Sequence, residues 1–459
     1  MKNTIQNKFF LSFLVFVISN NLIAQSTLGY LDFLRQVKKE HPLAKKALLI
    51  KEQGSLVVKE ARGVYDPVLS TKYKEKNFDN KNYYTLFESD LSINTIAGIK
   101  LSAGYGDDQG KYLNPENFNP TGGLGYLGAS IPLGKGLFFD ENRLLLRGAQ
   151  QVQNQLNAES DMQLNDLFFM ASDAYWNWFA NYFVAQNTNN SVKLATDRFN
   201  LIKKEAASGE LSPNDTLKAY LQLRDRELDF LEAKRAEISS YFDLRRWIWD
   251  TTLVNQTIIP DEKSLSQSTV LAAVWSIDNN PKLNQLSSKI AEQGFERRYK
   301  IEKIKPKLNF DYSLLYNNYI PSFSRYGVDN LWGLSFQYPL FLRAERANLK
   351  MANLKIKSLE IDRQTTKNDL SLKLQNELSQ LSVLETQKNQ LDGMLMNYSS
   401  LLNFENIKYS IGESTLFELN AWELKMLEGQ NKLVKVETKN AITYAKLFWY
   451  SNAWSTFIN

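Results

Sequence analysis

The chain has 459 residues, 43% of them hydrophobic and 23% charged, a composition typical of an ordered, packed protein. Its formal net charge is +5, and so weak a balance argues against a nucleic-acid-binding role. The sequence contains no cysteine, which excludes a disulfide framework, a cysteine-based zinc site and a lipid-anchored N-terminal cysteine.

Residues 1–24 have the features of a secretory signal peptide. Lys2 and Lys8 supply a positive start, residues 9–19 are apolar, and Ala24 ends a small-residue cleavage site. We expect this segment to be removed. Its loss takes away two positive charges and leaves a formal net charge of +3.

The remaining chain repeats itself. Proline, arginine and glycine landmarks recur in the same order in both halves, and the interval between the last two landmarks is the same in each half. The matched landmarks are Pro42 and Pro281, Pro67 and Pro306, Pro132 and Pro339, Arg143 and Arg346, and Gly209 and Gly412. We therefore divide the chain into a first structural repeat (25–250), a linker (251–267), a second structural repeat (268–450) and a short C-terminal tail (451–459).

Each repeat is predicted to run helix, strands, long helix, turn and, finally, a further helix. The first helices cover residues ~29–62 and ~268–304, and residues ~214–249 form the helix after the first turn. From Leu164 to Phe199 a heptad seam follows the first long helix. A helix that fills the interval from Arg143 to Gly209 is about 100 Å long, roughly three times the thickness of a bilayer core, which favours a structure that crosses a compartment.

The strand segments alternate between apolar and polar residues. Trp332, Leu334 and Phe336 alternate with small or polar residues, and Leu308 and Phe310 do the same before them. A strand between lipid and an aqueous lumen needs this pattern. A half-buried strand of a soluble protein has it too, so the strands alone leave both interpretations open.

These features together resemble the TolC-like outer-membrane factor (outer membrane efflux protein) family over residues ~29–450. The segment 174–178 (AYWNW) is similar to the aromatic segment on that family's first long helix, and 411–416 (IGESTL) is similar to its second tip turn. The resemblance implies a membrane α+β fold. Three chains form one outer-membrane β-barrel, which a long periplasmic α-helical barrel continues, with two internal repeats per chain.

The resemblance also implies a function. The protein would be a passive exit duct of a tripartite efflux pump or a type I secretion system, and not an enzyme. Its partners would be two further copies in a homotrimer, a periplasmic adaptor (membrane fusion) protein, an inner-membrane transporter and outer-membrane lipid. The alternative from another class is a secreted or periplasmic coiled-coil scaffold without a channel. A scaffold has no need for two sets of strands with alternating aromatic faces.

The first repeat departs from the family's common two strands per repeat. The stretch from Pro67 to Pro132 is almost twice as long as the matching stretch from Pro306 to Pro339, so the first repeat carries an insertion. Residues 87–93 and 99–105 alternate, which predicts an additional hairpin around 80–106. We expect this hairpin to extend the extracellular side rather than to enlarge the barrel.

Two glycine-centred segments are predicted to be turns, because glycine allows the backbone to reverse where a helix ends. The resemblance implies that these turns are adaptor-docking tips. The resemblance further implies a periplasmic gate of Asp215, Glu418 and Tyr409 near these turns. Ser414 and Ala421 stand where the family has an arginine and an acid, so the charge network is thinner here. Capping of the following helix is the alternative role for Asp215. The tip residues are Gly209, Glu210 and Leu211 in the first turn and Gly412, Glu413, Ser414 and Thr415 in the second.

No catalytic, cofactor-binding or metal-binding residues are predicted. The only histidine, His41, precedes a proline at a helix start and has neither a second histidine nor a cysteine to join it in a metal site. Trp176 and Trp178 are interpreted as packing residues on the heptad seam rather than as a ligand platform.

Overall fold

The computed structural model describes residues 26–249, 258–265, 275–317, 323–324, 327–454 and 458. The predicted signal peptide lies outside the described residues, and so does most of the predicted linker. The chain divides into two compact units, which we call the helical unit and the sheet unit. The helical unit comprises residues 1–47, 161–280 and 368–459, and the sheet unit comprises residues 48–160 and 281–367.

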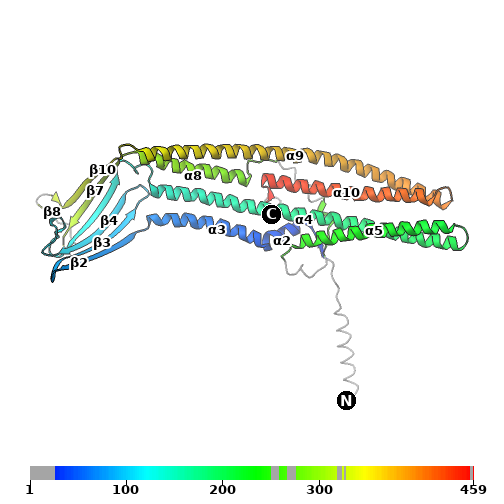
Figure 1. Ribbon diagram of the computed structural model, residues 1–459, viewed down its shortest axis with the longest axis horizontal. Coiled ribbons are helices and arrows are strands. Elements are labelled where there is room, and N and C mark those ends of the chain that lie inside the picture. Colours follow the sequence, from blue (N-terminus) through cyan, green and yellow to red (C-terminus); the bar gives the residue numbers. More distant parts are fainter. Residues whose placement is uncertain are drawn as a thin grey trace, which may run out of the picture. The chain divides into compact units, whose positions relative to one another are not determined.

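The longest elements are helices, and the strands of the main sheet come from one stretch of each half of the chain (Figure 1). The first half contains β1 (Ser26–Leu28), α2 (Tyr30–Glu40), α3 (Pro42–Arg62), β2 (Val68–Phe78), β3 (Lys81–Asn94), β4 (Lys100–Gln109), β5 (Leu124–Pro132), α4 (Glu141–Ala207) and α5 (Pro213–Arg245). The second half contains β6 (Ile258–Pro260), α8 (Pro281–Ile304), β7 (Lys307–Tyr316), β8 (Phe323–Ser324), β9 (Gly327–Val328), β10 (Asn330–Gln337), α9 (Arg343–Ser410) and α10 (Leu416–Ser451).

The predicted first helices differ from the observed ones at their boundaries. The helix expected over residues ~29–62 is divided into α2 and α3, because His41 ends α2 in an extended conformation and Pro42 begins α3. His41 Nδ1 accepts a hydrogen bond from the Leu43 backbone amide at 3.1 Å, so the imidazole belongs to this junction. The helix expected from residue 268 begins only at Pro281 within the described residues.

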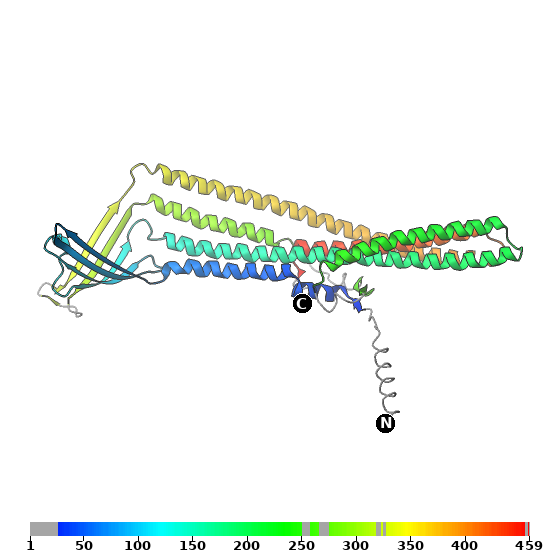
Figure 2. The same cartoon turned by 60° about the horizontal axis from the view of Figure 1, so that its bottom comes forward.

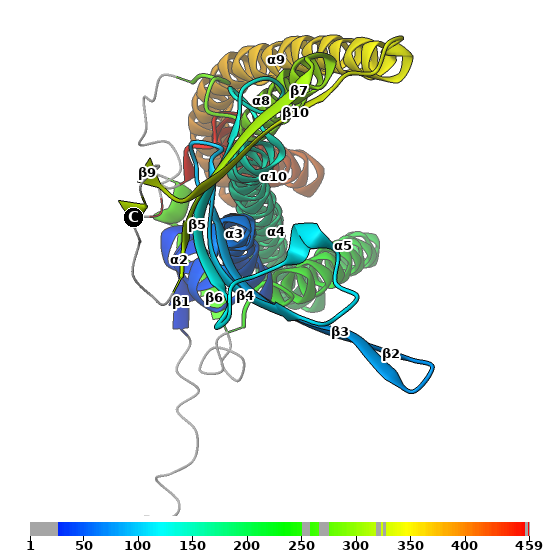
Figure 3. The same ribbon diagram turned by 90° about the vertical axis from the view of Figure 1, so that its left-hand side faces the viewer.

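Six strands of the sheet unit form one antiparallel sheet in the order β10-β7-β5-β4-β3-β2, and the short strands β8 and β9 pair with each other. Figure 3 shows it as a curved sheet with β10 and β2 at its two ends. The two repeats meet where β5 pairs with β7, with Ala129 opposite Tyr312. The sheet therefore joins strands that are far apart in the sequence.

The additional hairpin exists, and its two strands lie within the sheet. Strands β3 and β4 pair along ten residues, and β4 then pairs with β5 along seven. The hairpin is thus inserted into the sheet and raises the number of strands in this sheet to six. The physical reason is that β3 and β4 keep backbone partners on both edges, which an isolated hairpin in water lacks.

The core of the helical unit is built around the aromatic segment of α4. Tyr175, Trp176 and Trp178 are fully buried, which confirms that the tryptophans pack. The Tyr175 hydroxyl donates to the Leu28 carbonyl at 2.8 Å, and the Tyr30 hydroxyl donates to Ser172 Oγ at 2.8 Å. Because these polar groups have partners, the apolar rings can be buried without leaving their hydroxyls unsatisfied.

A second apolar seam remains exposed on α5, which lies beside α4 in the helical unit (Figure 2). Its residues recur at intervals of three, four or seven, and Leu228 is 64% exposed and Phe242 is 65% exposed. Such a seam is typical of a helix that packs against another helix. The seam consists of Leu217, Leu221, Leu228, Leu231, Ile238 and Phe242.

No described helix is both long and apolar enough to cross a membrane.

Candidate functional site

The candidate site is the end of the helical unit where two helix-reversing turns lie together (Figure 1). The first turn joins α4 to α5. Gly209 has a φ of +85°, and the Glu210 amide donates to the Glu205 carbonyl at 3.0 Å while the Gly209 amide donates to Ala206 at 3.2 Å. This hydrogen-bond pair ends a helix with glycine in the left-handed conformation. Leu211 follows, and Ser212 caps α5 through its hydroxyl.

The second turn, from α9 to α10, uses the same geometry. Gly412 has a φ of +79°, its amide donates to the Tyr409 carbonyl at 3.1 Å, and the Glu413 amide donates to Lys408 at 2.9 Å. A Cβ at either Gly209 or Gly412 would meet no atom within 4 Å. The glycines are therefore required for backbone conformation rather than for space.

The two turns differ in how the next helix begins. In α10, Thr415 and Glu418 form a capping box: the Thr415 hydroxyl accepts from the Glu418 amide, and the Glu418 carboxylate accepts from the Thr415 amide at 3.4 Å. Ser414 Oγ donates to the buried carboxylate of Glu405 and also to Glu418. The second turn is consequently held by more side-chain bonds than the first.

The acidic candidates have local partners. Asp215 lies in the first turn of α5 and pairs with Lys218 at 3.1 Å, while the capping residue of this helix is Ser212. Burial raises the pKa of the Tyr409 phenol above its ordinary value, and the carboxylates of Glu205 and Asp215 raise it further. Tyr409 of the second turn and Asp215 of the first thus lie close enough to interact electrostatically.

Sequence reasoning missed the contacts that tie the two turns together. Arg198 of α4 forms a bidentate ion pair with Glu423 of α10, with N–O distances of 2.5 and 2.6 Å, and both side chains are largely buried. The Arg198 guanidinium also donates to Asn420 Oδ1 at 2.8 Å, and Asn420 in turn donates to Gln222 of α5. A planar fork matched to a carboxylate fixes geometry as well as charge.

The sheet unit has a second candidate surface. Because paired residues share a face in an antiparallel sheet, the register places Leu69, Leu91, Ala103, Leu127 and Leu314 in one row on the same face. This face is mostly apolar or aromatic, with polar residues such as Thr71, Ser89 and Asp107 among them, and the opposite face is mostly polar. The apolar face is exposed to solvent in the single chain.

The exposure of this face is large at the edge strand β10. Trp332, Leu334 and Phe336 are each at least 60% exposed. A monomeric soluble protein rarely leaves so large an apolar surface uncovered. The alternation predicted from the sequence is therefore present, and its apolar side is left without a covering layer.

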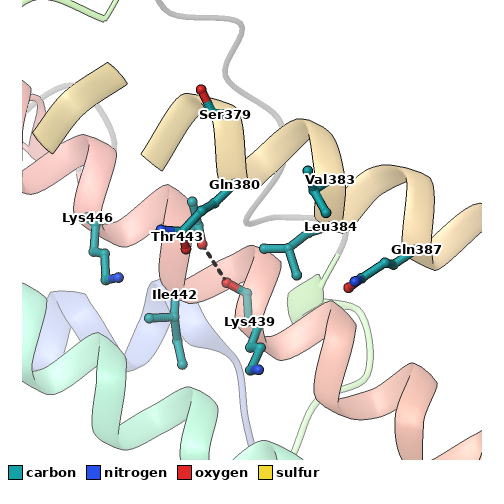
Figure 4. A pocket seen from close by; sticks show the side chains of 9 residues that line it. All are labelled: Ser379, Gln380, Val383, Leu384, Gln387, Lys439, Ile442, Thr443 and Lys446. Atoms are coloured by element: carbon teal, nitrogen blue, oxygen red, sulfur yellow. Dashed lines mark hydrogen bonds between the residues drawn. The ribbon is translucent and has the colours of Figure 1, made fainter. Parts of the chain in front are cut away.

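A groove of about 500 Å³ lies between α9 and α10 (Figure 4). Val383, Leu384 and Ile442 make part of its wall apolar. Lys446 at its rim is bound by the buried carboxylate of Glu377, with the ammonium 3.1 Å from an oxygen. An open, mainly apolar groove with a paired lysine suits a packed helix better than a small polar ligand.

The described residues contain no group of three or more histidine, cysteine, aspartate or glutamate side chains placed to hold a metal ion. His41 lies at the junction of α2 and α3 and stacks on Trp247 with ring centroids 5.5 Å apart.

No sequence-family model matches the chain, and none of the curated proteins matches it either. Solved structures do. The CmeC outer membrane channel of Campylobacter jejuni is 12% identical with a TM-score of 0.61, over 92% of this chain and 85% of that one. The outer membrane protein VceC of Vibrio cholerae is 11% identical with a TM-score of 0.61, over 91% of this chain and 94% of that one.

A third similar structure is the MtrE outer membrane channel of Neisseria gonorrhoeae, in its open state. It is 13% identical with a TM-score of 0.62, over 92% of this chain and 88% of that one. The chain has the fold of the TolC-like outer-membrane factors. The resemblance stated from the sequence is therefore confirmed for the fold, across nearly the whole chain.

We predict that the Arg198–Glu423 pair couples the two turns of this TolC-like fold. In a double-mutant cycle of Arg198→Ala and Glu423→Ala, the coupling energy should be about 1–3 kcal/mol, because the pair is bidentate and shielded from water. Amide hydrogen exchange at the ends of α4 and α10 measures it. The exposed Lys218–Asp215 pair is the control and should give less than about 1 kcal/mol. Equal coupling in both pairs would contradict the prediction.

Proposed function

We propose that the protein is an outer-membrane exit duct, which passively conducts substrates delivered by an inner-membrane pump. The observation that carries this proposal is the exposed apolar face shared by all six strands of the sheet. Such a face is stable in lipid, while the polar face suits an aqueous lumen. The fold of known outer-membrane channels supports the same conclusion. A coiled-coil scaffold without a channel would leave that face in water at a large cost in free energy.

A single sheet with two open edges cannot lie in lipid, because its edge N–H and C=O groups would have no hydrogen-bond partners there. We propose that three copies join their sheets into one closed wall, as the resemblance implies. A homotrimer gives each edge a partner without requiring more strands from one chain.

The helices support the same assembly. The exposed seam of α5 and the groove between α9 and α10 are apolar surfaces on the helical unit, and each suits a helix from a neighbouring copy. We propose that the helical units of three copies form the periplasmic part of the duct. The two internal repeats would then supply six similar helix pairs around one axis.

We propose that the two glycine turns face the periplasmic adaptor protein. Their side chains at Glu210, Leu211 and Glu413 are exposed or half-buried, and the turns are short and well defined. We also propose that Asp215, Glu418 and Tyr409 contribute to a gate. Three copies would place six carboxylates around the axis, and a ring of like charges favours cations. The Lys218 partner of Asp215 weakens its share of the ring, so Glu418 is the stronger candidate.

The first prediction from this proposal concerns assembly and conduction. The mature protein extracted in mild detergent should have the native mass of a trimer, and it should produce discrete single-channel currents in a planar bilayer. Fractionation should recover it with the outer membrane. A soluble monomer in the periplasmic fraction would leave the duct proposal without support.

The second prediction concerns the tips. Glu210→Trp with Glu413→Trp leaves both positive-φ glycines in place and should abolish export while trimer insertion is kept, because bulky side chains would stand at the proposed docking surface. Gly209→Asn with Gly412→Asn is the matched control, since asparagine tolerates a positive φ and is small. Export should be measured with a substrate of the cognate pump. Loss of export in both variants would assign the effect to the backbone instead.

The third prediction separates gate from cap. Asp215→Asn with Glu418→Gln removes two charges per chain while glutamine retains the capping box, so cation selectivity in a planar bilayer should fall. Ser212→Ala with Thr415→Ala removes the caps but retains the charges, and should leave selectivity unchanged. If only the second variant alters selectivity, the acids act through helix capping and not through a gate.

A further inference from the structure

The sheet contains more strands than the two repeats require. The second repeat contributes the β7–β10 hairpin, whereas the first contributes the four strands β2 to β5. Because strand number sets the width of a closed sheet, it matters whether the outer two strands of the first repeat, β2 and β3, are part of the wall or stand outside it. We call β2 and β3 the extra pair. The register and the side-chain contacts of the sheet unit decide between these two arrangements.

The apolar band of the sheet runs diagonally across the strands. On β10 it is centred on Leu334, which lies level with Phe310 of β7. On β4 it is centred on Ala103, which lies level with Leu127 of β5 and so with Leu314 of β7. On the scale of β7, the centre of the band therefore moves from residue 310 to residue 314, which is four residues over the three strand spacings from β10 to β4. Strands that are tilted relative to a membrane produce such a slope, since the lipid layer cuts across them at an angle.

The extra pair continues this slope without interruption. The band of β2 is centred on Thr71, and the register leads from there through Ser89, Tyr105 and Gly125 to Tyr316 of β7. From 314 to 316 the band moves two residues over the next two spacings. Over the whole sheet it moves six residues, about 20 Å at about 3.3 Å per residue, across five spacings of about 4.8 Å.

This ratio corresponds to a strand tilt of about 40°, which is within the range of about 35–45° found in membrane barrels. A hairpin that stood outside the wall would have no reason to follow the same slope. The extra strands are also long enough, since β2 has 11 residues and β3 has 14, and a tilted membrane strand needs about 9–11.

Contacts on the polar face bind the extra pair to the rest of the sheet. The Tyr126 hydroxyl of β5 donates to the Asp90 carboxylate of β3, so its ring passes over β4. It crosses β4 at Gly104, where a Cβ would collide with the ring. Lys72 of β2 then pairs with Glu88 of β3 at 3.0 Å. A chain of polar contacts thus runs from β5 to the outermost strand on the proposed lumen side.

Resting on the proposed trimeric duct, we propose that β2 of each chain pairs with β10 of a second copy, which gives an eighteen-stranded wall. Six strands per chain is an even number, so the two edge strands run in opposite directions and the seam is antiparallel like every other pair in the sheet. Barrel diameter grows roughly linearly with strand number, so the lumen is about 1.5 times as wide as with four strands per chain. Such a duct accepts bulkier substrates.

The seam can be tested by disulfide trapping, because the native chain contains no cysteine. Continuing the slope by one strand places Ser70 opposite Ser335 or Gln337 of the next copy, all on the polar face. Full-length Ser70→Cys with Ser335→Cys, and Ser70→Cys with Gln337→Cys, are purified as trimers and oxidised. In at least one of them most of the chain should shift to a covalent trimer on a denaturing gel.

The matched control is Ser102→Cys with Ser335→Cys, since Ser102 lies on the polar face of β4, inside the sheet. It should form no covalent trimer in the full chain. Deleting the segment 68–99 removes β2 and β3 and makes β4 the edge, and this same pair should then link the chains.

The outcomes distinguish the two proposals. If the Ser102 pair links full-length trimers and neither Ser70 pair does, β2 and β3 stand outside the wall; the eighteen-stranded seam is then overturned while the trimeric duct stands. If no pair links chains, the seam is also overturned. The native mass in mild detergent then decides whether the protein forms a trimer at all.

Discussion

Alternation with a period of two, kept in register across six strands, is the constraint on which the rest of the structure depends. A shift of one residue at any strand pair would move its apolar side chains to the polar face. Cross-strand contacts oppose such a shift. Tyr126 reaches across β4 to Asp90, and Gly104 is small enough to let it pass. The two faces are therefore fixed by specific side chains as well as by backbone pairing.

The helical unit is held together in a different way. Its core is concentrated where the aromatic segment of α4 meets α2 and α10, and there the hydroxyls of Tyr30 and Tyr175 are hydrogen-bonded. Towards the turns, rings give way to polar contacts such as the Arg198–Glu423 pair. Polar contacts specify alignment between long helices, whose apolar seams alone would allow sliding.

Much of this could be predicted because periodicity is a local property. The heptad seam of α4, the alternating strands and the glycines that end α4 and α9 are all readable from spacing. The predicted helix of the second repeat was wrong at the described residues 275–280, since α8 begins at Pro281 and the residue before a proline disfavours the helical conformation. The neighbours of the additional hairpin could not be predicted for a more basic reason: alternation shows that a segment is a strand but not which strand lies beside it.

The site shows the same division. Both tip glycines stand out in the sequence, and their positive φ values explain why glycine is needed. Four residues do not stand out, because they are ordinary polar residues on α4, α5 and the distant α10: Arg198, Glu423, Asn420 and Gln222. Only the packing of α4, α5 and α10 brings them together. The capping box at Thr415 was readable in principle, because threonine precedes glutamate by three residues.

The two turns are held by different numbers of side-chain hydrogen bonds, so the two repeats differ in stiffness at this end. Ser212 alone caps α5, whereas Thr415, Glu418, Ser414 and Glu405 together fasten the start of α10. Local unfolding proceeds first where the fewest bonds must be broken. The α4–α5 pair is therefore the more compliant of the two helix pairs and the α9–α10 pair the stiffer one, so a force applied equally to both turns would displace the α4–α5 turn further.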